Sequence, residues 1–485
     1  MRMKKIILSF LFFNFSFLIA SYAGGLMTNT NYHIAFDRMM ARGASIDIDA
    51  AYSNPAGLAW GHNGWQLSLN VQKPFQYRNI ETTLAQPYAT AVGFENHKYE
   101  GKATANPFVP AFFASYRHNK WAVSMMAGIV GSGGKVTYDE GIPTLVVPIR
   151  AKLSAGGLTP NYYNLDAYMQ GKQYIYGIQA NLTYRFNDHW SAAVGVRGNI
   201  YSGFSRGHLI AKVNPMVMLA TGLPEEALNM QLDVDQKGFG ICPMLSVNYK
   251  LNRLLITGRY EFRSRLNIPN KTNALSIAQV GAGGVVTPVD IKAMAEAMGN
   301  EATVAALTPA LGQEMVQKIA AYLPDVKNRY DMPGLLSVAV GYEFIPNKFR
   351  GTLEYHWFDD KHAKMAGDRQ ETLTHGTQEI LAGLEWDISK VVTVSAGGQR
   401  TDYGLSDDYQ SNTSFACDSY SVGVGAGFNV IKGLRVNVGY FCSIYKDYTR
   451  AENYGSKTDP MQALPATEKF SRTNHVFGIG IDYKF

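Results

Sequence analysis

The last eleven residues of the chain, HVFGIGIDYKF (475–485), alternate strictly between bulky apolar side chains and small or polar ones. Side chains of an extended strand point alternately to its two faces, so the bulky ones would share one face. They are Phe477, Ile479, Ile481, Tyr483 and Phe485. The same pattern runs through HWSAAVGVRGNIY (189–201) and LLSVAVGYEF (335–344). The sequence therefore predicts strands with one apolar face and one face unsuited to a dry core.

This alternation favours a transmembrane β-barrel over a soluble sheet. A soluble barrel would turn its bulky side chains inward, whereas here the polar face suits a wet lumen and the apolar face suits lipid. Beyond the first 23 residues, no run of about 18 apolar residues indicates a membrane-spanning helix. Only helices and closed barrels satisfy their backbone hydrogen bonds inside a bilayer, which leaves the barrel.

The alternating runs predict an all-β fold of fourteen antiparallel strands within residues 65–485. Short polar breaks, each close to an aromatic residue, would be tight periplasmic turns: YRHNKW (116–121), RFNDHW (185–190), YKLNRL (249–254), EFIPNKF (343–349), DISKVV (387–392) and VIKGLR (430–435). The opposite connections are long. Those at about 206–237 and 267–329 are expected to be helical extracellular loops, with Pro224 and the two glutamates after it starting a helix. Short turns at one end and long loops at the other are typical of porin-type barrels.

Residues 1–23 predict a cleaved secretion signal. Basic residues precede an apolar run, and Ser21 and Ala23 fit the small-residue positions of a signal-peptidase site. A membrane anchor is the alternative, but the apolar run is shorter than the ~20 residues that a spanning helix needs.

Composition argues against several classes of function. The formal net charge of +6 includes three basic residues of the signal, so a nucleic-acid partner is not expected. Three cysteines cannot all pair, so disulfides are not expected to hold the fold together. The sequence contains no Walker motif and no spaced Cys/His set. Neither an enzyme nor a metal or other cofactor is therefore expected.

A kinked, Ala-rich segment, DAAYSNPAGLAW (49–60), precedes the first strand. Pro55 fixes its own φ and Gly57 permits unusual dihedrals, so the chain is expected to fold back here. With its lead-in (36–59), the segment resembles the N-terminal motif of the FadL family, outer-membrane transporters of long-chain fatty acids and other hydrophobic compounds. The stretch VPAFFASYRHNKWAVSMMAGIVGSGG (109–134) resembles the second and third strands of that family. The terminal Phe485 also fits the resemblance to that family.

The resemblance implies that residues 24–64 form a hatch inside a barrel of residues 65–485. Its motif would be Asn54, Pro55, Ala56 and Gly57. A simple turn leading into the first strand is the alternative.

The resemblance also implies a place in the outer membrane of a Gram-negative bacterium, among its lipids, after insertion by the barrel assembly machinery through Phe485. A hydrophobic small molecule such as a fatty acid would be taken up passively and would leave sideways at a kinked third strand. A general diffusion porin for polar solutes is the alternative function.

Three groups of residues are candidates for the site. Glycines within a strand mark bulges, so Gly131, Gly133 and Gly134 are expected to form the kink, unless the strand simply ends there. Soft apolar side chains would line an entry groove between the two long loops, or merely pack these loops together: Met216, Met218, Leu219, Leu228, Met230, Met294 and Met298. Inward-facing cations would bind a carboxylate, or would brace the barrel in Arg–Glu pairs: Arg197, Arg259, Arg263 and Arg350.

Overall fold

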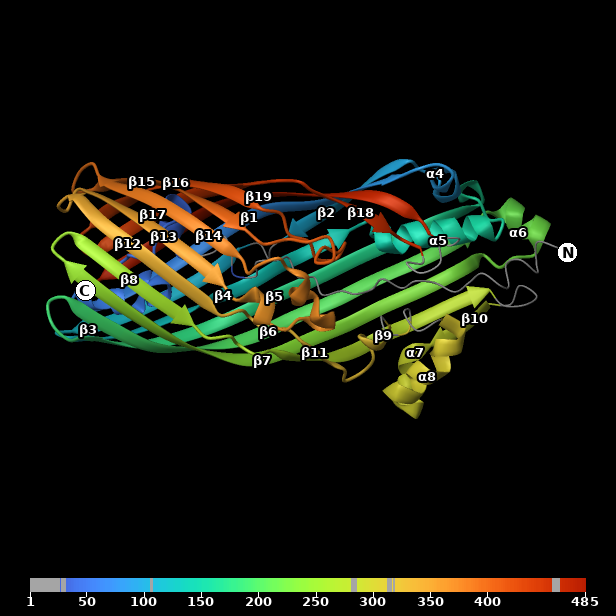
Figure 1. Cartoon of the computed structure of the whole chain (residues 1–485), viewed down its shortest axis with the longest axis horizontal. Helices are drawn as coiled ribbons and strands as arrows, with labels where there is room; N and C mark the ends of the chain where they lie inside the picture. The colour runs from blue at the N-terminus through green and yellow to red at the C-terminus, as the bar shows by residue number, and fades with distance from the viewer. Residues whose placement is uncertain are drawn as a thin grey trace.

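All strands of the structure join one antiparallel sheet that closes into a barrel, seen from the side in Figure 1. The ring closes where β1 (Gly64–Leu84) pairs with β19 (Pro465–Lys484), from Gln66 to Leu84 of β1. The computed structural model describes residues 27, 32–104, 108–280, 286–311, 316, 319–455 and 463–485. The expected secretion signal at 1–23 lies outside these residues.

The nineteen described strand segments make fourteen barrel strands, as predicted. Several barrel strands consist of two successive segments. We count such segments as one strand because they pair with the same neighbouring strand or continue the same ladder. These pairs of segments are β2 (Asn96–Thr104) with β3 (Val109–His118), β8 (Leu254–Glu261) with β9 (Asn267–Val280), β11 (Lys327–Arg329) with β12 (Leu335–Ile345), and β17 (Leu434–Tyr445) with β18 (Tyr448–Asn453). A short hairpin strand, β10 (Val286–Asp290), folds back on β9.

The remaining barrel strands are continuous, and their alternation is the predicted one. They are β4 (Trp121–Tyr138), β5 (Tyr163–Arg185), β6 (Trp190–Val213), β7 (Glu226–Leu251), β13 (Phe349–Phe358), β14 (Gln378–Asp387), β15 (Val392–Asp402) and β16 (Ser419–Ile431). Val194 is 55% exposed and Ile479 53%, although both are large and apolar, whereas polar inward residues such as Asn199 are fully buried. The apolar side chains therefore cover the outside of the barrel.

The prediction of a helical loop at 206–237 is wrong. β6 and β7 extend through most of it, and only α6 (Pro215–Thr221) is helical, at the far tip of the hairpin in Figure 1. Pro224 starts no helix, because β7 begins at Glu226. The apolar residues after it, Leu228 and Met230, recur every second residue and are buried, which is the period of a strand.

The expected loop at 267–329 is helical only in part. It contains α7 (Ile291–Met298) and α8 (Asn300–Leu311), but it begins as β9 and ends as β11. The other helical segments of the outer part are α4 (Tyr88–Val92), α5 (Pro143–Ala155), η2 (Pro160–Tyr162), η4 (Asp360–His362) and η5 (Ala366–Thr372). No helix in the described ranges is long and apolar enough to cross a membrane.

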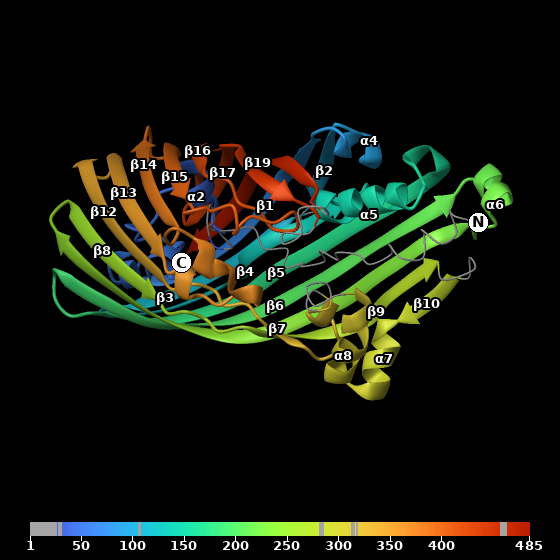
Figure 2. The same ribbon diagram turned by 45° about the vertical axis from the view of Figure 1, so that its right-hand side comes forward.

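Residues 32–60, called the inner segment below, lie inside the barrel. They contain α2 (Ile34–Met39), α3 (Ala50–Ser53) and η1 (Pro55–Trp60), and almost all of them are buried. Figure 2 shows α2 behind the strands of the wall, where it contacts β14 to β17, β19 and β1.

Glycines on the wall make this close approach possible. A Cβ added to Gly397 would lie 1.7 Å from the carbonyl oxygen of Met39, and one added to Gly423 would lie 2.5 Å from that of Asp37. Any larger side chain at these positions would push α2 away from the wall. The inner face of this part of the barrel is therefore shaped to receive the helix.

Candidate functional site

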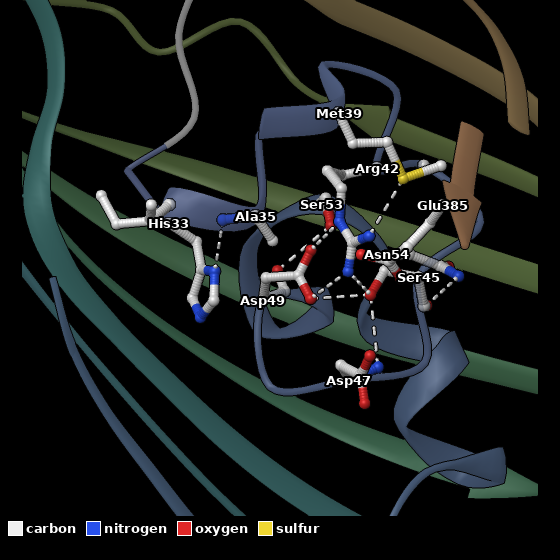
Figure 3. Close-up of polar contacts among 12 residues, drawn as sticks. His33, Ala35, Met39, Arg42, Ser45, Asp47, Asp49, Ser53, Asn54 and Glu385 are labelled. Carbon is white, nitrogen blue, oxygen red and sulfur yellow. Dashed lines mark hydrogen bonds and ion pairs between the residues drawn. The ribbon is translucent and has the colours of Figure 1, made fainter. Parts of the chain in front are cut away.

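An ion pair within the inner segment gives it its own tertiary structure. The guanidinium of Arg42 donates to both oxygens of Asp49, from Nε at 2.6 Å and from a terminal nitrogen at 2.9 Å (Figure 3). Ser45 donates to Asp49 at 2.7 Å and accepts from Arg42 at 2.9 Å. Both charges are buried, and a bidentate pair with every partner satisfied is the arrangement that burial requires.

The predicted hatch motif lies against the wall formed by β5, β6 and β7. The hydroxyl of Thr183 donates to the carbonyl of Pro55 at 2.8 Å, and that of Ser191 donates to the carbonyl of Ala56 at 2.9 Å. Asn54 donates to the carbonyl of Ser45 at 3.0 Å, which folds the segment back on itself. Gly57 serves close approach and not unusual dihedrals, because a Cβ there would lie 2.3 Å from the Ser45 oxygen.

Further polar contacts tie the inner segment to the opposite wall. The carboxylate of Glu354 accepts from the backbone N–H groups of Arg42 at 2.9 Å and Gly43 at 2.7 Å. Arg38 is paired with Glu385 at 2.6 Å. Lys484 lies 3.1 Å from Asp47 and holds the pKa of that carboxyl well below its usual range. The inner segment is thus anchored on several sides of the lumen.

The four candidate lumenal arginines all have acidic partners. Arg197 and Arg259 share the buried carboxylate of Glu261, and both guanidinium groups lie within 5.8 Å of the Tyr52 ring centre. All three guanidinium nitrogens of Arg197 are engaged in such contacts, whereas the Nε–H of Arg259 has no hydrogen-bond partner.

The other two candidates are engaged in the same way. Arg350 pairs with Glu385 and, at 2.7 Å, with Asp387. Arg263 lies 3.8 Å from Asp331 and donates to the carbonyl of His362. All four side chains therefore hold parts of the protein together in this structure.

The glycines expected to form a kink lie at two β-bulges. The register between β4 and β5 shifts between Ile129 and Gly131, and again between Ser132 and Gly134. Gly134 has φ +75°, and a Cβ there would meet open space. Bulges bend a strand and increase its twist, so β4 is irregular where the sequence indicated.

The hydrogen-bonded ladder between described residues has a gap beside these bulges. β3 pairs with β4 only as far as Ala127, and β2 pairs with β4 only from Lys135. Between these two ladders, residues 128–134 of β4 have no strand partner on that side among the described residues. On its other edge, β3 pairs with β1 from Val109 to Arg117, so Val109 and Pro110 have a strand partner on one side only among the described residues. We call this gap in the described ladder the break beside β4; residues 105–107, which stand opposite its outer part in this register, lie outside the described residues.

An apolar cluster lines the lumen next to the break. It joins side chains of the wall to side chains of the inner segment, and Ile129 and Val130 of the first bulge belong to it. We call it the lumenal apolar cluster: Tyr32, Ile48, Tyr52, Leu58, Phe113, Met126, Ile129, Val130, Tyr174, Tyr201, Leu266, Ile268, Tyr330 and Met332. The sequence analysis missed it. The signal was the adjacent pair Ile129 and Val130, which breaks the alternation of β4.

The seven apolar candidates for an entry groove are divided by the structure. Leu228 and Met230 are buried in β7, with Met218 and Met294 at the border of the same cluster. Met216 and Leu219 are 82% and 89% exposed at the tip of α6, and Met298 is also exposed. Four of the seven thus share one apolar cluster, and three face away from it.

A closed barrel of this kind is also found among solved structures. The chain is similar to a Pseudomonas aeruginosa FadL homologue, with a TM-score of 0.61 and 15% identity over 95% of this chain and 99% of that one. For the Pseudomonas putida toluene transporter TodX, the TM-score is 0.54, with 12% identity over 93% and 97% of the two chains. For the Ralstonia pickettii toluene transporter TbuX, it is 0.51, with 11% identity over 94% and 98%.

These likenesses cover nearly the whole of both chains, so this protein has the fold of the FadL-type barrels. No protein-family model and no curated protein sequence matches the chain.

Proposed function

We propose that this chain is an outer-membrane protein for the passive uptake of hydrophobic molecules. The observation that carries the proposal is the lumenal apolar cluster, which extends from the inner segment to the first of the two bulges of β4. A lumen that served only polar solutes would not need apolar side chains at this place. The similarity in fold to toluene transporters supports the same class of ligand.

The break beside β4 is the proposed exit. A hydrophobic molecule released into water would lose the free energy of burial, about 0.8 kcal/mol for each methylene group. Release through the wall into lipid avoids that cost. The unpaired edge of β4 and the bulges at Gly131, Gly133 and Gly134 supply an irregular wall at which such an opening can form.

The inner segment is the proposed hatch, corresponding to residues 24–64 of the sequence. Its ion pairs with Glu385 and Lys484 and its hydrogen bonds to Glu354 support a plug that stays in place. A fixed plug favours uptake of hydrophobic molecules over general diffusion of polar solutes.

The finer features of the pathway are also proposals. Met218, Leu228, Met230 and Met294 would contact the ligand on the outer side, with Met216, Leu219 and Met298 as first contacts at the surface. The barrel would lie in the outer membrane of a Gram-negative bacterium, with lipid around its apolar face. Phe485 would be read by the barrel assembly machinery, which its 56% exposure permits.

Transport assays in liposomes test the function. The intact protein should carry radiolabelled dodecanol and exclude arabinose in a swelling assay. A variant lacking residues 24–64 should admit arabinose, because the plug is gone. Rapid arabinose entry through the intact protein, without dodecanol uptake above empty liposomes, would instead identify a general diffusion porin.

A further inference from the structure

Two arginines lie side by side on the inner wall. Arg78 of β1 and Arg472 of β19 are direct partners in the ladder that closes the barrel. Both are inward positions, since Ile80 and Phe470, the next pair on the same face, are fully buried. Side chains paired in this way have Cβ atoms about 5 Å apart. Arg78 is only 4% exposed, and its Nε–H has no hydrogen-bond partner.

No ion pair joins either arginine to an acidic side chain within the described part of the chain. The guanidinium of Arg472 lies 4.8 Å from the ring centre of Tyr445, and the ring of Tyr138 lies over Gly101, the partner of Arg78 in β2. The contrast with other buried arginines is clear. Arg38, Arg42 and Arg450 each have a carboxylate within 2.7 Å.

Two neighbouring cations without a counter-charge call for an anion. Burying a charge is costly unless the charge is paired, and guanidinium groups bind the oxygens of carboxylate or phosphate in pairs. We propose that Arg78 and Arg472 bind an oxyanion carried by the transported molecule, so that this molecule is an anionic amphiphile and not a neutral hydrocarbon. This inference rests on the proposed function, since it gives the hydrophobic ligand a charged end.

The surroundings of the two arginines suit an amphiphile better than an inorganic ion. Phe470 packs on Phe415 with ring centres 4.7 Å apart, and both belong to the same apolar cluster as Ile80 and Tyr138. Along β4, Tyr138 follows Gly134 by four residues, about 13 Å of extended strand. An alkyl chain of moderate length could therefore reach from the arginines to the unpaired edge of β4.

Binding of two matched probes to the detergent-purified mature protein tests this site. Dodecanoate and dodecanol share one alkyl chain and differ in the carboxylate. By isothermal titration, dodecanoate should bind at least tenfold more tightly than dodecanol. Arg78→Gln and Arg472→Gln should each weaken dodecanoate at least tenfold and leave dodecanol unchanged. Lys102→Gln on β2 removes the same charge from an exposed side chain and should change neither probe.

A thermal melting experiment shows whether the variants are folded and provides a second measure of binding. Dodecanoate should raise the thermal midpoint of the wild type and of Lys102→Gln, but not that of the two arginine variants. Arg472→Lys keeps the charge without the planar fork and should restore part of the shift. Equal affinity of the wild type for both probes would contradict the proposed anion site, and so would an undiminished shift of the thermal midpoint in the arginine variants. Neither result would contradict hydrophobic uptake. Failure to bind either probe would count against the proposed function itself.

Discussion

Asp37 shows how tightly a single residue of the inner segment is held. Its Oδ1 accepts from the side-chain amide of Gln72 at 3.0 Å, and its Oδ2 has no hydrogen-bond partner among the described residues. A Cβ added to Gly478 would lie 2.3 Å from that oxygen. Burial therefore raises the pKa of Asp37 well above its ordinary value. The side chain fits closely against the wall, but its ionised carboxylate is buried there with one oxygen that accepts no hydrogen bond from the described residues.

Asp37 gives a pH-dependent prediction. Because its folded-state pKa is raised, the folded protein binds more protons than the unfolded chain at pH values between the two pKa values, so this residue lowers stability as pH rises through that window. Asp37→Asn should raise the thermal midpoint at pH 8 by an amount equivalent to about 1–3 kcal/mol, with a smaller effect at pH 5. Asp139→Asn, at an exposed side chain, is the control. A lower midpoint for Asp37→Asn at both pH values would contradict the assignment.

The sequence predicted which arginines point inward, but not what they contact. Alternation places Arg197 and Arg350 on the lumenal face, and the structure agrees. Their partners depend on register and closure of the barrel. Arg197 pairs with Glu261 of a different strand, and Arg78 meets Arg472 only because the first strand joins the last. No local pattern carries that information.

At the scale of elements, the barrel strands were predictable because lipid and lumen impose a period of two on each of them. The helices and strands of the outer region were not predictable in this way. α5 lies in a connection for which no helix was expected, and it carries Pro148 within the helix, a residue that usually ends one. Leu228 and Met230 were interpreted as helical because Pro224 and two acidic residues precede them. Pairing of β7 with β6 overrides that local preference.

The bulges of β4 give a prediction at this scale. Replacing Gly131, Gly133 and Gly134 together with valine should reduce dodecanol uptake at least tenfold, because β-branched side chains favour a regular strand and would fill the irregular wall. Gly198→Val on β6, where an added Cβ would lie 3.5 Å from the Phe239 ring, is the matched control. Heat-modifiable migration should show that both variants form barrels. Undiminished uptake by the triple variant would place the exit elsewhere.

At the scale of the whole molecule, the apolar outer face, the anchored inner segment and the break beside β4 form one arrangement. In the proposed function, a hydrophobic molecule would follow a path inside the barrel, and the inner segment would close the direct route along the axis. Glycines such as Gly397 and Gly423 allow that closure, although in the sequence they appear only as small residues on the lumenal face. The fold was therefore within reach of the sequence. The shape of the path depends on side chains that meet across the lumen.

A reversible cross-link across the break tests the central claim most directly. A Cβ added to Gly128 of β4 would lie 3.2 Å from the Cβ of Ala111 of β3, close to the roughly 3.8 Å of a disulfide. In the Ala111→Cys, Gly128→Cys variant, oxidation should abolish dodecanol uptake by preventing the two strands from moving apart, and reduction should restore it. The wild type, whose three cysteines are all free, should respond to neither treatment. Equal uptake by the oxidised and reduced variant would contradict exit through the wall at β4.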